Sequence, residues 1–269
     1  MHLDTPESPP DTPAQRQTDR RRLLRAFNAS LACVLMLTAI FTAQASFDWR
    51  ALAVVPQSIA GLVGVLTAPL LHGSIGHLAA NAASILLLGT LAGTVYPRTT
   101  RRALPLLWLG SGLGAWLLGD AGSHHLGASG LTHGLMFVLF VLGLLRRDRP
   151  AVAAAMIAFA LYGGMLLTIL PRELDVSWQS HLGGALAGVA SALLWRRSDP
   201  LAPRRRYSWE IEDALAEDAA RADREQFEPP SPHEVPVLWR REAVDARDTP
   251  RGAVLPFARR GDAPERSRD

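Results

Sequence analysis

A serine stands between glycines in the stretch Gly127-Ala128-Ser129-Gly130, where a polar loop meets a long apolar run. Glycines carry no side chain, so a second backbone or a substrate can come close. Free backbone N–H groups at a helix start favour developing negative charge. A nucleophilic serine with an oxyanion hole needs both features. The alternative is a packing point between membrane helices, which uses the same small residues.

Other polar residues lie at the ends of apolar runs, where ionisable groups are costly and suggest function. His77 and Asn81 are four residues apart, which places them on one helix face, and Ser129 and His133 share that spacing. These pairs predict two helices that present polar groups at the same side of a membrane.

His181 opens another apolar run and is followed by Gly184 and Gly188. This small-xxx-small spacing predicts tight packing against a neighbouring helix, with His181 on the same face. A histidine held in this way could accept the proton of Ser129 and return it to a leaving amine.

Three groups could donate hydrogen bonds to an oxyanion: the side chains of His77 and Asn81, and the backbone N–H of Ser129. The spans offer no buried carboxylate to orient the histidine. The sequence therefore predicts a serine–histidine dyad rather than a triad.

Acidic residues are strongly segregated along the chain. Of 25, four precede Phe27 and sixteen follow Arg197, which leaves five in the 171 residues between. So few carboxylates in so long a region indicate membrane spans rather than a soluble domain. Apolar runs of suitable length predict an all-α polytopic bundle of six spans, at residues 27–45, 77–96, 103–119, 129–145, 151–170 and 181–195.

Arginines divide the predicted spans into two sides. Twelve arginines flank one side, whereas only Arg50 and Arg172 lie on the other. By the positive-inside rule both termini are cytoplasmic, in a cell (plasma or inner) membrane, with Ser129 and His181 near the outer side. Because this arginine pattern reports topology, no nucleic-acid partner is expected.

Three domains follow from the charge pattern. Residues 1–26 are polar and rich in proline and arginine, which predicts a disordered cytoplasmic tail. Residues 27–197 contain the six spans. Residues 198–269 are charged and proline-rich, which predicts a second cytoplasmic tail that is largely disordered, with some helical character near residues 207–226.

Three segments of the chain resemble the three signature blocks of the rhomboid intramembrane serine proteases. They lie on the second, fourth and sixth spans, at residues 71–81, 127–130 and 181–188. The resemblance covers residues 27–197. It implies Ser129 as nucleophile and His181 as general base. It also implies a transmembrane helix of another protein as substrate, cleaved near its outer end within the lipid bilayer.

The same resemblance assigns supporting roles. It implies His77 and Asn81 as oxyanion donors, with Gly127 allowing close approach, and His72 as a support for the loop before the second span. His133 departs from the family, which usually has an aromatic residue there that stacks on the catalytic histidine. An imidazole can stack too; a direct part in proton transfer is the alternative.

Competing functions are less well supported by the sequence. A soluble serine hydrolase would carry Gly-x-Ser-x-Gly, but position 131 is leucine. A membrane metalloprotease would carry His-Glu-x-x-His, and this pattern is absent from the sequence, so no metal and no cofactor are expected. A catalytically inactive rhomboid-like protein that binds membrane helices is the main alternative to an active protease.

Overall fold

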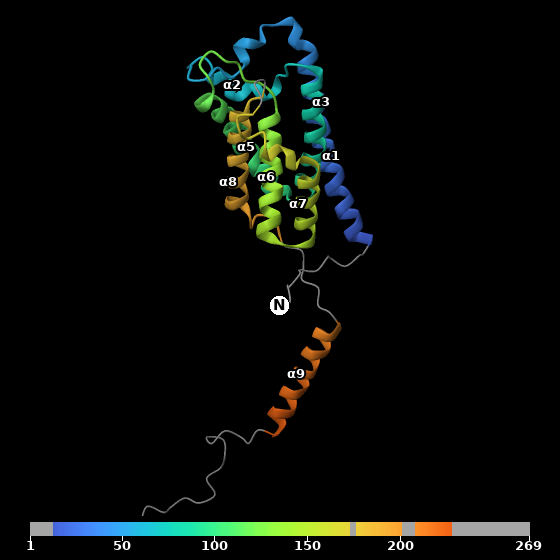
Figure 1. The fold of residues 1–269 in the computed structure, drawn as a ribbon. Coiled ribbons are helices and arrows are strands. Elements are labelled where there is room, and N and C mark those ends of the chain that lie inside the picture. The colour runs from blue at the N-terminus through green and yellow to red at the C-terminus, as the bar shows by residue number, and fades with distance from the viewer. Residues whose placement is uncertain (1–12, 173–175, 201–207, 228–269) are drawn as a thin grey trace, which may run out of the picture. The chain divides into compact units, whose positions relative to one another are not determined.

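The computed structural model describes residues 13–172, 176–200 and 208–227, which are almost wholly helical. The chain divides into two units, Met1–Tyr207 and Ser208–Asp269, and the second contains α9 (Ser208–Phe227). Figure 1 shows the helices of the first unit: α1 (Pro13–Ala43), α2 (Leu62–Thr67), α3 (Ile75–Ser84), α4 (Thr90–Val95), α5 (Pro97–Leu118), α6 (Ser129–Arg146), α7 (Arg149–Tyr162) and α8 (Trp178–Trp195). Short 3-10 helices add η1 (Gln44–Ser46), η2 (Trp49–Leu52), η3 (Ala68–Leu70) and η5 (Gly163–Leu166), and the π-helical segment η4 (Ile85–Gly89) joins α3 to α4.

Within the described residues, four helical segments are long and apolar enough to cross a membrane: Pro13–Ser46, Ile75–Val95, Ser129–Arg146 and Arg149–Leu166. The protein is therefore a multi-pass, all-α membrane protein. The other two predicted spans correspond to α5 and α8, which fall outside this set; arginines occupy the first turns of α5, and polar residues the first turn of α8. The count of six spans stays a prediction.

The distribution of side chains is that of a bundle surrounded by lipid. Large apolar side chains are exposed on the outer faces of several helices, among them Leu35, Met156, Leu161, Leu186 and Leu194. Polar side chains are buried between helices instead, including Ser111, Thr132 and Ser191. Such an arrangement is stable where lipid covers the apolar exterior and the interior polar groups face neighbouring helices.

Helix α1 differs from the expected N-terminal tail. It begins at Pro13, so residues 13–26 are helical rather than disordered, and residues 1–12 lie outside the described part of the chain. Arginine and leucine favour helix, and an existing span allows the helix to extend at little cost. Proline is also well tolerated in a first helical turn.

The fifth predicted span also differs in length from its prediction. The fifth span was expected to reach residue 170, but α7 ends at Tyr162 and continues as η5 from Gly163. Two adjacent glycines weaken a helix at this point. In the C-terminal segment, α9 at residues 208–227 agrees with the helical character predicted near residues 207–226, while residues 201–207 and 228–269 lie outside the described residues.

Helix α8 packs between α5 and α6 through glycine contacts. A Cβ placed on Gly183 would lie 2.9 Å from the Cα of Gly114 in α5, and one on Gly188 would lie 3.1 Å from the Cα of Gly134 in α6. Both contacts are too close for any larger residue without a shift of the backbone. Below them, the core is made of apolar side chains such as Leu107, which is fully buried.

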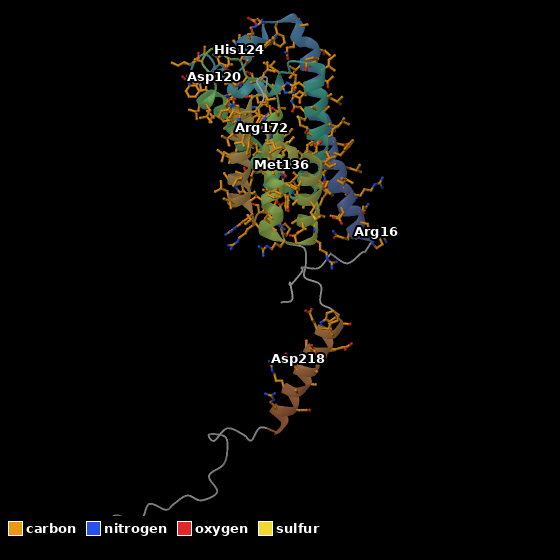
Figure 2. The ribbon with its side chains drawn as sticks, in the orientation of Figure 1. Arg16, Asp120, His124, Met136, Arg172 and Asp218 are labelled. Atoms are coloured by element: carbon orange, nitrogen blue, oxygen red, sulfur yellow. The ribbon has the colours of Figure 1, made fainter. Side chains whose placement is uncertain are left out.

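The loops at one end of the bundle include Asp120 and His124, and Figure 2 shows them opposite Arg16 at the start of α1. The N-termini of α3, α6 and α8 are on the same side as these loops, as Figure 1 shows for α3. Polar residues in the first turns of these helices are thereby gathered at one end of the protein.

Hydrogen bonds of Asp199 stabilise the opposite end of the bundle. Its buried carboxylate accepts hydrogen bonds from the backbone N–H groups of Arg98 and Thr99 at the start of α5, both at 2.9 Å. Arg146 at the end of α6 donates to the Asp199 carbonyl at 2.8 Å and pairs with Asp148 at 3.1 Å. Asp199 therefore connects the segment after α8 to the N-terminus of α5 and the C-terminus of α6.

Replacement of Asp199 by alanine should destabilise the protein by about 2 kcal/mol, because two charge-assisted bonds to a helix N-terminus are lost. Thermal unfolding of the purified protein in detergent measures this loss. Asp48→Ala is the matched control, since Asp48 caps only the exposed turn η2. Equal unfolding temperatures for Asp199→Ala and wild type would contradict this role.

Candidate active site

Ser129 and His181 face each other at the N-terminal ends of α6 and α8. The Ser129 Oγ lies 2.8 Å from Nε2 of His181, within hydrogen-bond distance. Ser129 is the first residue of α6 and is half-buried, while His181 lies in the first turn of α8 and is buried. The two side chains that the sequence singled out as nucleophile and base are therefore adjacent.

The glycines that follow His181 explain this proximity. A Cβ on Gly184 would overlap the backbone of Gly130, lying 2.6 Å from its carbonyl carbon, and one on Gly188 would lie 2.9 Å from the Cβ of Phe137. Their absence of side chains lets the two helices approach along one face. This approach brings the first turns of α6 and α8 together.

The other ring nitrogen of His181 has a fixed partner. Its Nδ1 lies 3.0 Å from the backbone carbonyl oxygen of Thr168. A carbonyl only accepts hydrogen bonds, so Nδ1 carries the proton and Nε2 presents its lone pair to Ser129. The sequence analysis missed Thr168 because a backbone carbonyl has no residue signature.

His133 stacks on His181. The two rings are 3.8 Å apart at their centroids and inclined by 13°. Nδ1 of His133 bonds the Ser129 carbonyl at 2.6 Å, and Nε2 bonds the Thr168 hydroxyl at 2.8 Å. Both nitrogens are thus engaged away from the Ser129 hydroxyl, which favours stacking over direct proton transfer.

The expected oxyanion donors lie on α3. His77 and Asn81 line a cleft of about 1180 Å³ together with Ser129, His133 and His181. Asn81 is buried and its Nδ2 has no hydrogen-bond partner within the described residues. A buried amide left unpaired is costly, and Asn81 lines the cleft, so its amide is a candidate donor to a substrate oxygen.

Gly127 lies in the loop that leads into α6, two residues before Ser129. Its φ of 113° is a conformation that glycine adopts readily and other residues rarely. A Cβ there would meet the ring of His77, 2.6 Å from Nε2. Its backbone N–H donates to the Ala68 carbonyl at 2.9 Å, which fastens the loop to η3. Gly127 therefore allows close approach between this loop and α3.

His72 lies next to His77 and is not among the residues that line the cleft. Its ring is fully buried and lies edge-on to His77, with centroids 5.1 Å apart. The side chain of Gln44 bonds both the N–H and the carbonyl of His72, at 3.1 and 2.9 Å. Burial lowers the pKa of His72 to about 4, with His77 as a smaller cause, so the ring is neutral at pH 7.

His125 fastens the loop before Ser129. Its Nδ1 lies 2.7 Å from the Ser177 hydroxyl and its Nε2 lies 2.9 Å from the Ser123 hydroxyl. Its backbone also pairs with Val54 in both directions at 2.9 Å. This histidine therefore connects three loops around the cleft, a role that its position in the sequence did not indicate.

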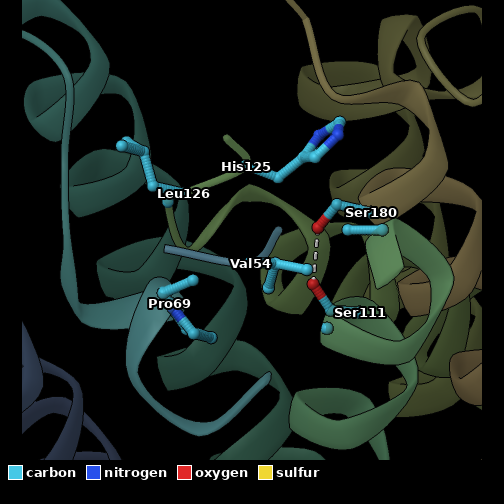
Figure 3. Close-up of a pocket in the computed structure, with 10 residues that line it drawn as sticks. Val54, Pro69, Ser111, His125, Leu126 and Ser180 are labelled. Atoms are coloured by element: carbon cyan, nitrogen blue, oxygen red, sulfur yellow. Dashed lines mark hydrogen bonds between the residues drawn. The ribbon is translucent and has the colours of Figure 1, made fainter. Parts of the chain in front are cut away.

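A further contact fixes the first turn of α8. The hydroxyls of Ser111 in α5 and Ser180 in α8 share a hydrogen bond of 2.7 Å (Figure 3). They line a small cavity of about 10 Å³ that also includes Leu126 and Pro69. Because Ser180 directly precedes His181, this bond helps to fix the position of the histidine backbone.

Comparisons with known proteins agree with this architecture. The Rhomboid domain family matches residues 60–198. An uncharacterized protein of Mycobacterium tuberculosis is 34% identical over 204 residues, which are 72% of this chain and 85% of the relative. An uncharacterized protein of Mycobacterium leprae is 38% identical over 141 residues, 49% of this chain and 56% of the relative.

Fold and site define a multi-pass helical membrane protein with a serine and a histidine in contact at one end. The chain belongs to the rhomboid family. Members of this family are generally intramembrane serine proteases, and inactive homologues occur among them.

Replacing Gly127 by alanine should slow cleavage of a transmembrane peptide by at least about 100-fold, because displacing His77 misplaces groups around the reacting carbonyl. Gly122→Ala is the control: Gly122 also has a positive φ, 81°, but open space around its Cα. We expect it to lose about 1 kcal/mol of stability and to keep its activity. Equal rates for the two variants would show that the contact with His77 is unimportant.

Proposed function

We propose that this protein is an intramembrane serine endopeptidase that cleaves transmembrane helices of other membrane proteins near the outer membrane boundary. The observation that supports this most directly is the 2.8 Å contact between Ser129 and His181, with the opposite nitrogen of the imidazole bound to a carbonyl. This arrangement supplies a nucleophile and a base in the correct tautomer.

The first half of the proposed reaction forms an acyl-enzyme. Ser129 Oγ attacks the peptide carbonyl carbon while its proton passes to Nε2 of His181. The developing oxyanion accepts hydrogen bonds from Asn81, His77 and the Ser129 N–H. The C–N bond then breaks as His181 donates its proton to the leaving nitrogen, and the N-terminal part of the substrate remains esterified to Ser129.

The second half regenerates the enzyme. Water enters through the polar cleft and attacks the ester carbonyl, while His181 accepts a proton from it. The tetrahedral intermediate collapses, the ester C–O bond breaks, and the proton returns to Ser129 Oγ. Each step uses only side chains, backbone groups and water, and we propose no metal or cofactor.

Arginine asymmetry supports the proposed orientation in the membrane. Arg98, Arg101 and Arg102 begin α5, and Arg146 and Arg147 end α6, all on the side remote from Ser129. We therefore place both termini in the cytoplasm, the cleft near the outer face, and the protein in the cell membrane.

Residues 27–197 are the proposed protease domain, flanked by segments 1–26 and 198–269. The contacts of Asp199 extend the part needed for folding by a few residues beyond residue 197. The proposed partners are a transmembrane protein substrate and the lipid bilayer, without a nucleic acid.

Ser129→Ala and His181→Ala should each slow cleavage by at least about 1000-fold, because the two groups act as a unit. Cleavage of a fluorescent transmembrane peptide in proteoliposomes measures the rate. Ser191→Ala is the matched control, since this serine is buried in α8 and lies outside the cleft. A folded wild type that binds such peptides without cleaving them would instead indicate an inactive homologue.

Asn81→Ala should lower kcat by about 100-fold with little change in KM, because an oxyanion donor acts mainly in the transition state. Single-turnover and steady-state kinetics in the same liposomes separate the two constants. A rise in KM with an unchanged kcat would assign Asn81 to substrate binding instead.

A further inference from the structure

Thr168 contacts both histidines of the site, although it lies in neither of their helices. It follows η5, in the turn that continues α7. Its backbone carbonyl accepts the Nδ1–H of His181 at 3.0 Å. Its hydroxyl lies 2.8 Å from Nε2 of His133. One residue thus reaches the proposed base and the ring stacked on that base.

The carbonyl of Thr168 occupies the position that a carboxylate takes in a catalytic triad. It fixes the proton on Nδ1 and leaves Nε2 as acceptor for the Ser129 hydroxyl. It also places the negative end of a peptide dipole beside the imidazolium that forms during attack. A buried carboxylate would add a desolvated charge, which is costly inside a membrane, whereas the carbonyl adds none.

The hydroxyl of Thr168 orients His133. Nδ1 of His133 faces the Ser129 carbonyl at 2.6 Å, so it carries the proton, and Nε2 must accept. The Thr168 hydroxyl donates a hydrogen bond to this Nε2. The same hydroxyl lies 3.1 Å from the Met165 carbonyl oxygen, which is the alternative acceptor for its proton. Two bonds at opposite ends of the imidazole fix the ring in its plane, parallel to His181.

We infer that Thr168 is a positioning residue for the base: its carbonyl sets the tautomer of His181, and its hydroxyl holds His133 flat against that ring. This inference rests on the proposed function of the dyad. Thr168 also lines the cleft. The groups that face the two rings from neighbouring elements include His77 on α3, Ser129 on α6, Thr168 itself and the backbone carbonyl of Met165 in η5.

The hydroxyl is tested by a double-mutant cycle with Thr168→Val and His133→Phe. Thr168→Val removes the donor with little change of shape and should lower kcat by about tenfold with KM within about twofold, since the base is misoriented but the cleft remains. Thr168→Ser should restore the rate. In the His133→Phe background, which has no ring nitrogen, Thr168→Val should change kcat by less than about twofold.

Thr94→Val is the matched control, because Thr94 also bonds a backbone carbonyl within its helix but lies in α4, outside the cleft. Equal losses from Thr168→Val in both backgrounds would overturn the role of the hydroxyl and assign the effect to packing. No loss in the wild-type background would overturn it as well.

A 15N NMR spectrum of protein labelled with 15N-histidine tests the role of the Thr168 carbonyl independently of activity. The His181 signals are assigned as those missing from a His181→Gln variant. We expect the neutral ring to carry its proton on Nδ1. A proton on Nε2 would overturn the inference even in an active enzyme. If the wild type cleaves nothing but shows the Nδ1 tautomer, the proposed function fails while the positioning of His181 stands.

Discussion

Close backbone contact between α8 and its neighbours α5 and α6 sets the position of His181 relative to Ser129. Glycines of α8 lie against glycines of both helices, and a Cβ on Gly183 or Gly184 would collide with the facing backbone. Lipid provides no hydrophobic force between helices, so such packing depends on direct van der Waals contact and on interhelical hydrogen bonds such as that between Ser111 and Ser180. Ser129 and His181 begin the two helices that cross there, so their 2.8 Å separation follows from this contact.

A second constraint is the cost of charge in a membrane interior. The site is made from neutral groups: hydroxyls, imidazoles, an amide and backbone carbonyls. Thr168 supplies a carbonyl where soluble serine proteases use a carboxylate, and the charged Asp148 and Asp199 lie at the opposite end among the arginines. In the proposed mechanism, proton transfer from Ser129 creates charge only transiently, beside the backbone carbonyl dipole of Thr168.

Much of this arrangement could be predicted from spacing. Polar residues four apart and the glycines after His181 indicated which helix faces meet, and the structure brings these residues to one cleft; their chemical roles stay predictions. Thr168 could not be predicted, because every residue has a carbonyl and its use depends on tertiary position. The helical extension of α1 to Pro13 and the early end of α7 at Tyr162 were missed, since propensity locates helix ends poorly.

The central claim, that contact with His181 activates Ser129, is tested most directly by covalent labelling. The purified protein in detergent is treated with a fluorophosphonate, digested, and the modified residue located by mass spectrometry. This account predicts a single adduct on Ser129 in wild type and none in His181→Ala. An adduct on another serine, or equal modification of Ser129 without His181, would contradict it.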